Sequence, residues 1–182
     1  KGLAATLNRG ISISRGRYLA RQDQDDISLP ERLEKQLKYL HANPKCGMVG
    51  TWAEIFSSVE RGKRFHRHPI DDAAIRFYLF FNNPFVHSSV MIRKSVFDEL
   101  GGYSTDPERQ PPEDYELWSR LSSKYCLANI PEVLIRYREV GNSMSRDGNR
   151  PFEKYLTKLS TENILRALNS HVTNEEATDL VN

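Results

Sequence analysis

The sequence predicts an α/β fold in which helices flank a mixed sheet. Segments with the short apolar or alternating pattern of strands recur between segments with helical periodicity, which is the arrangement typical of α/β domains. A chain of 182 residues is long enough for one domain with a buried core. The expected strands are residues 17–23, 47–57, 85–93 and 127–138, and the expected helices are residues 2–13, 28–42, 71–81, 94–100, 113–125 and 151–169.

The composition excludes several classes of protein. With 26 basic and 24 acidic residues, the net charge is only +2, so the chain has no charge excess that favours nucleic acid. No apolar run reaches the length of a membrane-spanning helix. Cys46 and Cys126 are too few for a disulfide framework, and we expect both as free thiols in a reducing compartment.

The elements of the N-terminal third follow from spacing and from start and stop signals. Leu3, Leu7 and Ile11 recur every four residues and predict the first helix. Ser28, followed three residues later by Glu31, fits a capping box and predicts the start of the next helix. The expected buried stripe of that helix consists of Leu29, Leu33, Leu37 and Leu40.

The middle of the chain begins with weak alternation over residues 47–57, which predicts a strand. Residues 60–68, ERGKRFHRH, read as a basic loop, which is either solvated or attracts an anionic substrate or lipid phosphate. After the predicted helix 71–81 and strand 85–93, Gly101 and Gly102 end the short helix 94–100.

The C-terminal half contains a helix with a clear apolar face, because Leu117, Trp118 and Leu121 recur at helical spacing. Pro131 interrupts the extended segment that follows, and residues 141–149 are polar and expected to be flexible. The last helix is apolar on one side, so we expect something to cover that side. Its stripe consists of Phe152, Tyr155, Leu156, Leu159 and Leu165.

Three carboxylates follow the first predicted strand. Asp23, Asp25 and Asp26 lie where a strand ends and a helix starts, and ligands of α/β sheets bind beyond strand ends. A turn and the helix dipole explain Asp26 well. Three adjacent aspartates repel one another, however, and this favours a bound divalent cation with a phosphate beside it. Both explanations stay open on local grounds.

Glu113 and Asp114 open the helix EDYELWSRL. First-turn acids stabilise a helix through its dipole, and this explanation suffices for the pair on local grounds. Asp114 precedes Leu117 and Trp118 by three and four residues, so its side chain projects from the end of the buried face. A carboxylate at the edge of a cleft is suited to act as a general base.

Other candidates have both structural and functional interpretations. His87, expected in the middle of a strand, is more typical of a hydrogen-bonded core residue than of a catalyst. His66 and His68 have the i, i+2 spacing of metal ligands on a strand, but their basic neighbours disfavour a metal. Arg136 and Arg138 either clamp phosphate oxygens or form the outward side of a strand.

These segments, in this order, resemble the inverting glycosyltransferases of family 2, which have the GT-A fold. The resemblance covers residues 2–145. A D-x-D motif alone is weak evidence, whereas several segments in the right order are specific. The segments are GLAATLNRGI with GRYLARQDQDDISLPERLEKQ, then NPFVHSSVMIRKSVFDELGGY, EDYELWSRL and IPEVLIRYREVGNSMS.

The resemblance implies a donor side. Asp23 and Asp25 would be the D-x-D pair that holds Mn²⁺ or Mg²⁺ against the diphosphate of a nucleotide-sugar, a UDP- or dTDP-sugar. Asp26 would either share the cation or contact the ribose of the donor, and Arg138 would also contact the donor.

The resemblance also implies an acceptor side. Asp114 would take the proton of the acceptor hydroxyl, with inversion at the anomeric carbon, and Glu113 would support it or contact the acceptor. His87 and Ser88 would line this side. The implied acceptor is a carbohydrate or a lipid-linked sugar of cell-envelope polysaccharide biosynthesis. The implied location is the cytoplasm, at the inner face of the membrane.

Two features depart from the family pattern. Val140 stands two residues after Arg138, where the family often has a histidine that contributes to the metal–diphosphate site. The family's N-terminal part, which supplies the first strands and the residue that reads the base, has no counterpart here. We therefore expect residues 1–150 to form a partial GT-A domain that has little activity alone, and residues 151–182 to form a helical extension. We also expect the partial domain to expose a sheet edge and two copies of the chain to form a homodimer.

Two other functions stay open. A metal-dependent phosphoryl-transfer or hydrolytic enzyme would use the aspartate cluster, although Ile27 after Asp26 does not fit the D-x-D-x-T/V nucleophile motif. A non-catalytic carbohydrate-binding module of the same fold would bind a nucleotide-sugar without turnover.

Overall fold

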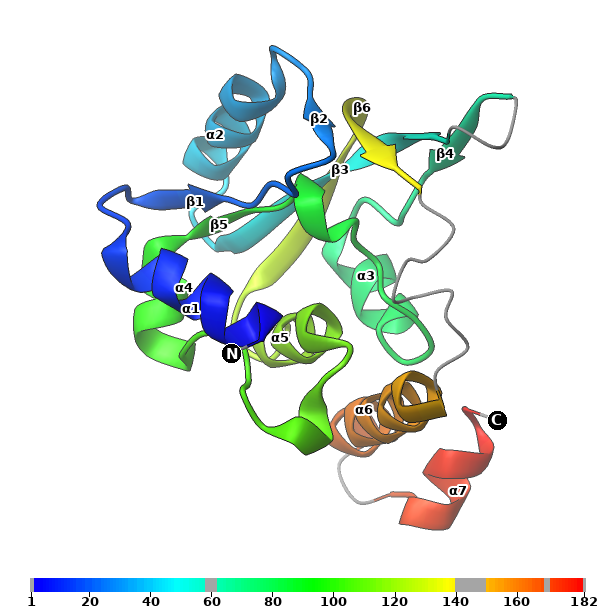
Figure 1. Ribbon diagram of the computed structural model, residues 1–182. Coiled ribbons are helices and arrows are strands. Elements are labelled where there is room, and N and C mark those ends of the chain that lie inside the picture. The colour runs from blue at the N-terminus through cyan, green and yellow to red at the C-terminus, as the bar shows by residue number, and fades with distance from the viewer. Residues whose placement is uncertain (1, 58–61, 140–149, 169–170, 182) are drawn as a thin grey trace.

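A mixed sheet of six strands forms the centre of the protein (Figure 1). The computed structural model describes residues 2–57, 62–139, 150–168 and 171–181. The strand order is β1-β5-β3-β6-β2, and β4 pairs with β3 without being part of this linear order. The two longest strands, β3 (Cys46–Phe56) and β6 (Cys126–Arg138), are parallel, and the other described pairings are antiparallel. The shorter strands are β1 (Tyr18–Ala20), β2 (Ile27–Ser28), β4 (Arg64–His66) and β5 (Met91–Arg93).

Helices cover both faces of this sheet, which confirms the predicted fold class. One face is covered by α2, while α1, α3, α4 and α5 cover the other, and α6 and α7 lie beyond α5 (Figure 1). The helices are α1 (Leu3–Ile13), α2 (Arg32–Ala42), α3 (Asp72–Tyr78), α4 (Lys94–Leu100), α5 (Glu113–Leu121), α6 (Arg150–Leu168) and α7 (Asn174–Asp179), with short 3-10 turns η1 (His87–Ser89) and η2 (Pro107–Arg109).

The period-two alternation of β3 divides the core between the two faces. Met48 packs into the cluster that contains α5, whereas Val49 packs into the cluster beneath α2. On α5, Leu117, Trp118 and Leu121 are fully buried, as the spacing predicted. Each such side chain contributes roughly 1.5–3 kcal/mol through burial, so the start of α5 is held firmly against the sheet.

The start predicted for α2 was wrong. Ser28 belongs to β2 instead of capping the helix, and the helix begins at Arg32 after Glu31, which makes no side-chain cap. The predicted stripe was also wrong at Leu33, which is 52% exposed, whereas Arg32 and Gln36 are buried beside Leu40.

Unpaired backbone carbonyls of the sheet explain this polar inner face of α2. Gln36 Nε2 donates to the carbonyls of Val49 (2.9 Å) and Ser89 (2.8 Å), and Arg32 Nη2 donates to that of Arg21 (2.6 Å). Buried carbonyls need donors, and long polar side chains supply them here where leucines would not. Burial lowers the pKa of Arg32 to about 10, which still leaves it charged at neutral pH.

The predicted strand 85–93 is shorter than expected. Only Met91–Arg93 pairs, between β1 and β3, and His87 starts a 3-10 turn instead of lying in the middle of a strand. The turn is closed by a hydrogen bond from the Ser89 amide to the Val86 carbonyl (2.8 Å), and Ser89 Oγ accepts from the Thr51 amide (3.2 Å). These bonds lift His87 out of the sheet.

The interruption predicted at Pro131 is a bulge within a continuous strand. The partner of Thr51 is Ile130, but the partner of Trp52 is Val133, so two residues of β6 are passed over. Proline lacks the amide hydrogen that a ladder position needs, and a bulge accommodates it.

The apolar side of α6, which we expected another part of the molecule to cover, packs on α5. Leu159 belongs to the core cluster that contains α5, and Asn163 Nδ2 donates to Ser119 Oγ on α5 (2.9 Å) and to the Leu79 carbonyl (2.8 Å). Helix α7 also packs on α6. The side chain of Phe152 and residues 141–149 lie outside the described residues. The sequence pattern did not predict α7. The boundary between residues 150 and 151 stays a prediction. No helix within the described ranges is both long and apolar enough to cross a bilayer.

Candidate active site

A cleft of about 780 Å³ brings together most of the predicted site residues. It receives side chains from the segment after β1, from η1, from the start of α5 and from the end of β6. These segments are far apart in sequence. The predicted residues that line it are Asp23, Asp25, His87, Ser88, Glu113, Asp114 and Arg138.

Asp23 reaches the cleft from the end of β1, where it forms an ion pair with Arg21. The Asp23 side chain is 40% exposed and that of Arg21 only 10%, so the carboxylate faces the cleft and the guanidinium lies behind it. Arg21 was missed by the sequence analysis. Its signal was the spacing of two, which places Arg21 and Asp23 on one side of an extended segment.

Asp26 joins three segments from just behind the cleft. Its Oδ1 accepts from the Arg138 amide (2.7 Å), and its Oδ2 accepts from Ser88 Oγ. Burial raises the pKa of Asp26, while these two hydrogen bonds act in the opposite direction. Asp26 therefore ties the turn after β1 to η1 and to the end of β6.

Asp25 is the most accessible of the three aspartates. Its carboxylate makes no hydrogen bond or ion pair with any described residue, while its backbone carbonyl accepts from Arg138 Nε (3.1 Å). The Arg138 guanidinium also lies over the Phe56 ring, 4.5 Å from its centroid. Asp25 is free to bind a cation, and Arg138 is held beside it.

The donor set fits a magnesium or manganese ion that keeps other oxygen ligands. Within the described ranges, no group of three or more His, Cys, Asp and Glu side chains has the arrangement of a metal site. Asp23 and Asp25 supply hard carboxylate oxygens at one edge of the cleft. One or two carboxylates together with water and substrate phosphates form the usual protein environment of Mg²⁺.

Glu113 and Asp114 approach from the start of α5 and are much more enclosed. Asp114 Oδ2 accepts from Asn83 Nδ2 (2.7 Å), and Oδ1 accepts from the Tyr115 amide (2.8 Å). Glu113 is only 8% exposed. Burial raises the pKa of both carboxyls, and the charge of Asp114 raises that of Glu113 further. Carboxylates with raised pKa values are suited to accept a proton.

His87 is both a hydrogen-bonded, largely enclosed histidine and a residue of the cleft. Its Nε2 lies 2.8 Å from Tyr103 Oη, and its Nδ1 lies 3.9 Å from Glu113 Oε1 and 4.0 Å from Asp114 Oδ2. The ring meets Trp118 edge to face, with 5.8 Å between centroids. Burial lowers the pKa of His87 far below its ordinary value, so the ring is neutral at pH 7.

An aromatic wall that the sequence analysis did not predict also lines the cleft. His66 and His68 stack with centroids 5.6 Å apart and 7° between their planes. Tyr137 meets His66 edge to face, and Tyr78 does the same with His68. Burial lowers the pKa of both histidines, that of His68 to about 4, so this wall is uncharged at neutral pH.

Other basic candidates do not join the described cleft. Arg136 pairs with Glu54 (3.1 Å), which agrees with the outward side of a strand, and Arg64 pairs with Glu139. The Arg67 guanidinium lies over the Trp52 ring. Val140 and Arg61 lie outside the described residues.

Both cysteines are free thiols, Cys46 buried and Cys126 exposed.

Comparison with known proteins identifies the family. The model described as "Glycosyl transferase family 2" matches residues 1–101. The chain is 37% identical over 139 residues to the amylovoran biosynthesis glycosyltransferase AmsE of Erwinia amylovora. This alignment covers 75% of this chain and 50% of AmsE. It is 30% identical over 177 residues to the O-antigen biosynthesis glycosyltransferase WbnJ of Escherichia coli, covering 91% of this chain and 67% of WbnJ.

Solved structures share the fold at low sequence identity. S. aureus TarS 1–349 in complex with UDP-GlcNAc matches with a TM-score of 0.60 and 11% identity, over 97% of this chain and 50% of TarS 1–349. The mannosyltransferase PcManGT from Pyrobaculum calidifontis, in complex with GDP-Man and Mn²⁺, matches with a TM-score of 0.54 and 17% identity, over 99% of this chain and 58% of PcManGT. The chain spans about half the length of the first curated relatives it matches. With the family model covering more than half of its residues, the chain belongs to glycosyl transferase family 2.

Proposed function

We propose that this chain carries the cation-binding and catalytic-base part of an inverting glycosyltransferase. The observation that supports this most directly is the meeting of Asp23 and Asp25 with Glu113 and Asp114 on one cleft. The reaction is the transfer of a sugar from a UDP- or dTDP-sugar to a hydroxyl of a carbohydrate or lipid-linked acceptor. Family membership favours this reaction over phosphate-ester hydrolysis.

On the donor side, Asp23 and Asp25 would hold Mn²⁺ or Mg²⁺, which when bound neutralises charge on the diphosphate. Arg138 lines the same edge of the cleft and adds a fixed positive charge that favours the phosphates. Arg21 keeps the Asp23 carboxylate paired when no cation is present. Asp26 holds these groups in place through Ser88 and the Arg138 backbone.

On the acceptor side, Asp114 takes the proton of the attacking hydroxyl. Its two hydrogen-bond donors, Asn83 and the Tyr115 amide, fix the carboxylate, and burial raises its affinity for a proton. A single base that activates the hydroxyl for attack opposite the departing diphosphate gives inversion at the anomeric carbon. Glu113 keeps the local charge negative, and His87 faces both acids.

The names of relatives suggest the pathway. AmsE is named for amylovoran biosynthesis and WbnJ for O-antigen biosynthesis, and one E. coli relative is a galactosyltransferase that acts on GlcNAc-diphosphoundecaprenol. We extend this to the present chain as assembly of a cell-envelope polysaccharide in the cytoplasm, at the inner face of the membrane.

The predicted homodimer is tested by light scattering during gel filtration.

Calorimetric titration tests the donor side of the proposal. UDP-GlcNAc and dTDP-glucose are titrated into the chain with Mn²⁺ and then with EDTA, and GDP-mannose serves as the comparison nucleotide. We expect binding of a uridine or thymidine nucleotide-sugar that EDTA abolishes. Equal binding with Mn²⁺ and with EDTA would contradict the assigned role of Asp23 and Asp25.

A further inference from the structure

We propose that Tyr103 is a positioning residue that holds His87 in the tautomer with its proton on Nδ1, aimed at Glu113 and Asp114. Tyr103 lies between α4 and η2 and does not line the cleft itself. It reaches the site through one contact, between its hydroxyl and His87 Nε2 at 2.8 Å. The significance of this contact for transfer rests on the proposed function, but the tautomer itself does not.

Counting protons around the ring supports the Nδ1–H form. Tyr103 is 5% exposed, and burial raises the pKa of its hydroxyl, so the hydroxyl keeps its proton. Among the described residues, His87 Nε2 is the hydrogen-bond partner of this hydroxyl. A buried O–H that lacks an acceptor is costly, so the hydroxyl donates and Nε2 accepts. The neutral ring then carries its proton on Nδ1.

The surroundings of Nδ1 favour the same assignment. Two carboxylate oxygens lie 3.9 and 4.0 Å from Nδ1, one from Glu113 and one from Asp114. An N–H dipole that points at carboxylates is favourable, whereas a lone pair in that position would be repelled by them. The opposite tautomer would leave both the Tyr103 proton and the Nδ1 lone pair without a suitable neighbour.

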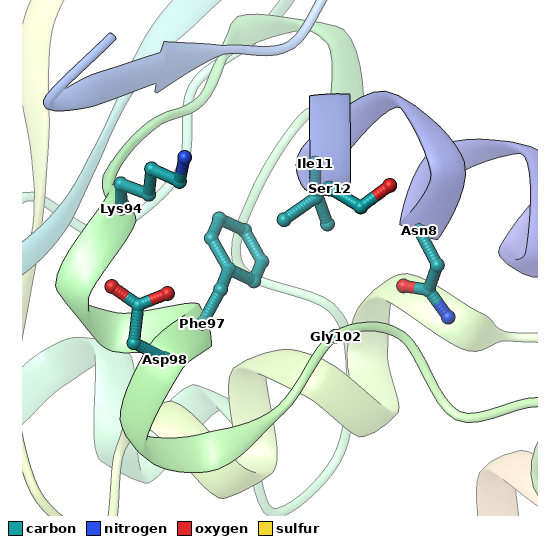
Figure 2. A pocket seen from close by; sticks show the side chains of 7 residues that line it. All are labelled: Asn8, Ile11, Ser12, Lys94, Phe97, Asp98 and Gly102. Atoms are coloured by element: carbon teal, nitrogen blue, oxygen red, sulfur yellow. The ribbon is translucent and has the colours of Figure 1, made fainter. Parts of the chain in front are cut away.

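The backbone of Tyr103 is held by the side-chain amide of Asn8. Asn8 Nδ2 donates to the Tyr103 carbonyl, and Asn8 Oδ1 accepts from the Tyr103 amide, each at 2.8 Å. Figure 2 shows Asn8 extending from α1 toward Gly102, at a cavity of about 280 Å³ between α1 and α4. A Cβ on Gly102 would lie 2.1 Å from Asn8 Oδ1, so glycine is required for this close approach.

The tautomer matters for an acceptor hydroxyl bound in this cleft. The distances of 3.9 and 4.0 Å are too long for direct hydrogen bonds, so the Nδ1–H remains available to another group. A hydroxyl oxygen that accepts from Nδ1–H directs its own proton toward Asp114. Loss of the tautomer would turn a donor into an acceptor and would misorient that hydroxyl.

Nuclear magnetic resonance of this chain with ¹⁵N-labelled histidine tests the proposal without substrate. Two-bond ¹H–¹⁵N correlations distinguish the nitrogen that carries the proton, and a His87→Gln variant assigns the signals among the five histidines. In the wild-type chain at pH 7 we expect His87 with Nδ1 protonated and Nε2 unprotonated. The Tyr103→Phe variant keeps the ring but loses the donor, so only the nearby carboxylates still favour Nδ1–H. We therefore expect the form of His87 protonated on Nε2 to become detectably populated in this variant.

Two further variants separate this effect from general disturbance. Tyr18→Phe removes a hydroxyl that accepts from Arg93 (3.1 Å) away from the cleft, and the His87 signals should not move. Asn8→Ala keeps the Tyr103 hydroxyl but releases its backbone, and a mixture of the two tautomers is expected. Protonated Nε2 in the wild type, or the same tautomer populations in Tyr103→Phe as in the wild type, would overturn the proposal.

The outcome is independent of whether the chain transfers sugar. If a nucleotide-sugar binds equally well with Mn²⁺ and with EDTA in the titration described above, the proposed function fails and the tautomer measurement still stands. If nucleotide-sugar binds and Tyr103→Phe leaves the tautomer unchanged, only the positioning role fails.

Discussion

The two groups of acids in the cleft differ in their surroundings more than in their chemistry. The Asp23 side chain is 40% exposed and paired with Arg21, and Asp25 is exposed. The Asp114 side chain is 15% exposed and that of Glu113 10%, and burial raises the pKa of both. Acids that differ this much in exposure and in their neighbours are suited to separate roles. The open group is suited to a cation and the enclosed group to a proton.

The origin of the difference is the element that carries each group. Asp23 and Asp25 follow a three-residue strand that pairs only with β5 among the described strands and lies at the end of the strand order. Asp114 starts a helix whose Trp118 and Leu117 are fully buried, which draws the first turn into the core. Position on the scaffold, and not residue type, therefore distinguishes the two groups of acids.

The largest expected effect is that of Asp114→Asn. A positioned general base contributes about 10²–10⁴-fold to a rate, so transfer by the full-length protein, measured with a nucleotide-sugar donor, should fall by about this factor. Donor affinity measured by calorimetry should remain, because the cation side is untouched. Asp98→Asn, an exposed aspartate on α4, serves as the control. Near-normal turnover of the Asp114 variant would remove the distinction between the two groups.

A smaller effect is expected from Asp25→Asn. Changes around metal sites cost roughly 10–100-fold in metal affinity, and we expect at least ~10-fold weaker Mn²⁺-dependent binding of UDP-GlcNAc. Thermal stability should stay unchanged, because the Asp25 carboxylate has no partner among the described residues. The exposed Asp179→Asn variant is the matched control. Unaltered binding would show that Asp25 holds no cation.

Ser88→Ala tests whether Asp26 joins the segments around the open group. The change leaves one oxygen of a half-buried carboxylate without its donor, which costs about 1–3 kcal/mol. Chemical denaturation measures this loss of unfolding free energy. Ser95→Ala, on the exposed side of α4, should cost much less. Equal stability of the two variants would mean that the contact between Ser88 and Asp26 does not hold the site.

The smallest expected effect concerns the pH dependence of stability. Because the folded-state pKa of Asp114 is raised, its contribution to stability is present below the ordinary value of 3.8 and is lost as pH rises through the folded pKa. Wild-type stability should therefore decline relative to Asp114→Asn as pH rises above 3.8. The difference between two melting-temperature curves measures this, and a constant difference would contradict burial of the acid.

Helical spacing and strand ends predicted the positions of the acids well. The spacing from Asp114 to Leu117 and Trp118 placed the carboxylate at the end of a buried face, and the cleft contains it. Arg21 was detectable in principle from its spacing to Asp23. Tyr103 was not detectable, because its bond to His87 depends on the packing of α4 against the sheet, which no local pattern encodes.

The errors share a physical cause. The strand 85–93 and the leucine stripe of α2 were predicted from apolar residues alone, as if backbone groups were always paired within their own elements. Instead, Gln36 and Arg32 supply donors to carbonyls of neighbouring segments, and Ser89 accepts from the Thr51 amide. These backbone groups come within reach of such side chains only once the sheet is assembled, so no local sequence pattern reveals the requirement.

The parallel pairing of β3 with β6 has a consequence for how the chain folds. The register joins Cys46 to Cys126 and Phe56 to Arg138, so the centre of the sheet depends on contacts across about 80 residues. Such high contact order slows folding, and until β6 arrives the eleven residues of β3 present a long edge open to intermolecular pairing. During synthesis, residues 1–101 therefore leave the ribosome before the central neighbour of β3 exists, and in this interval the unpaired edge of β3 is open to aggregation.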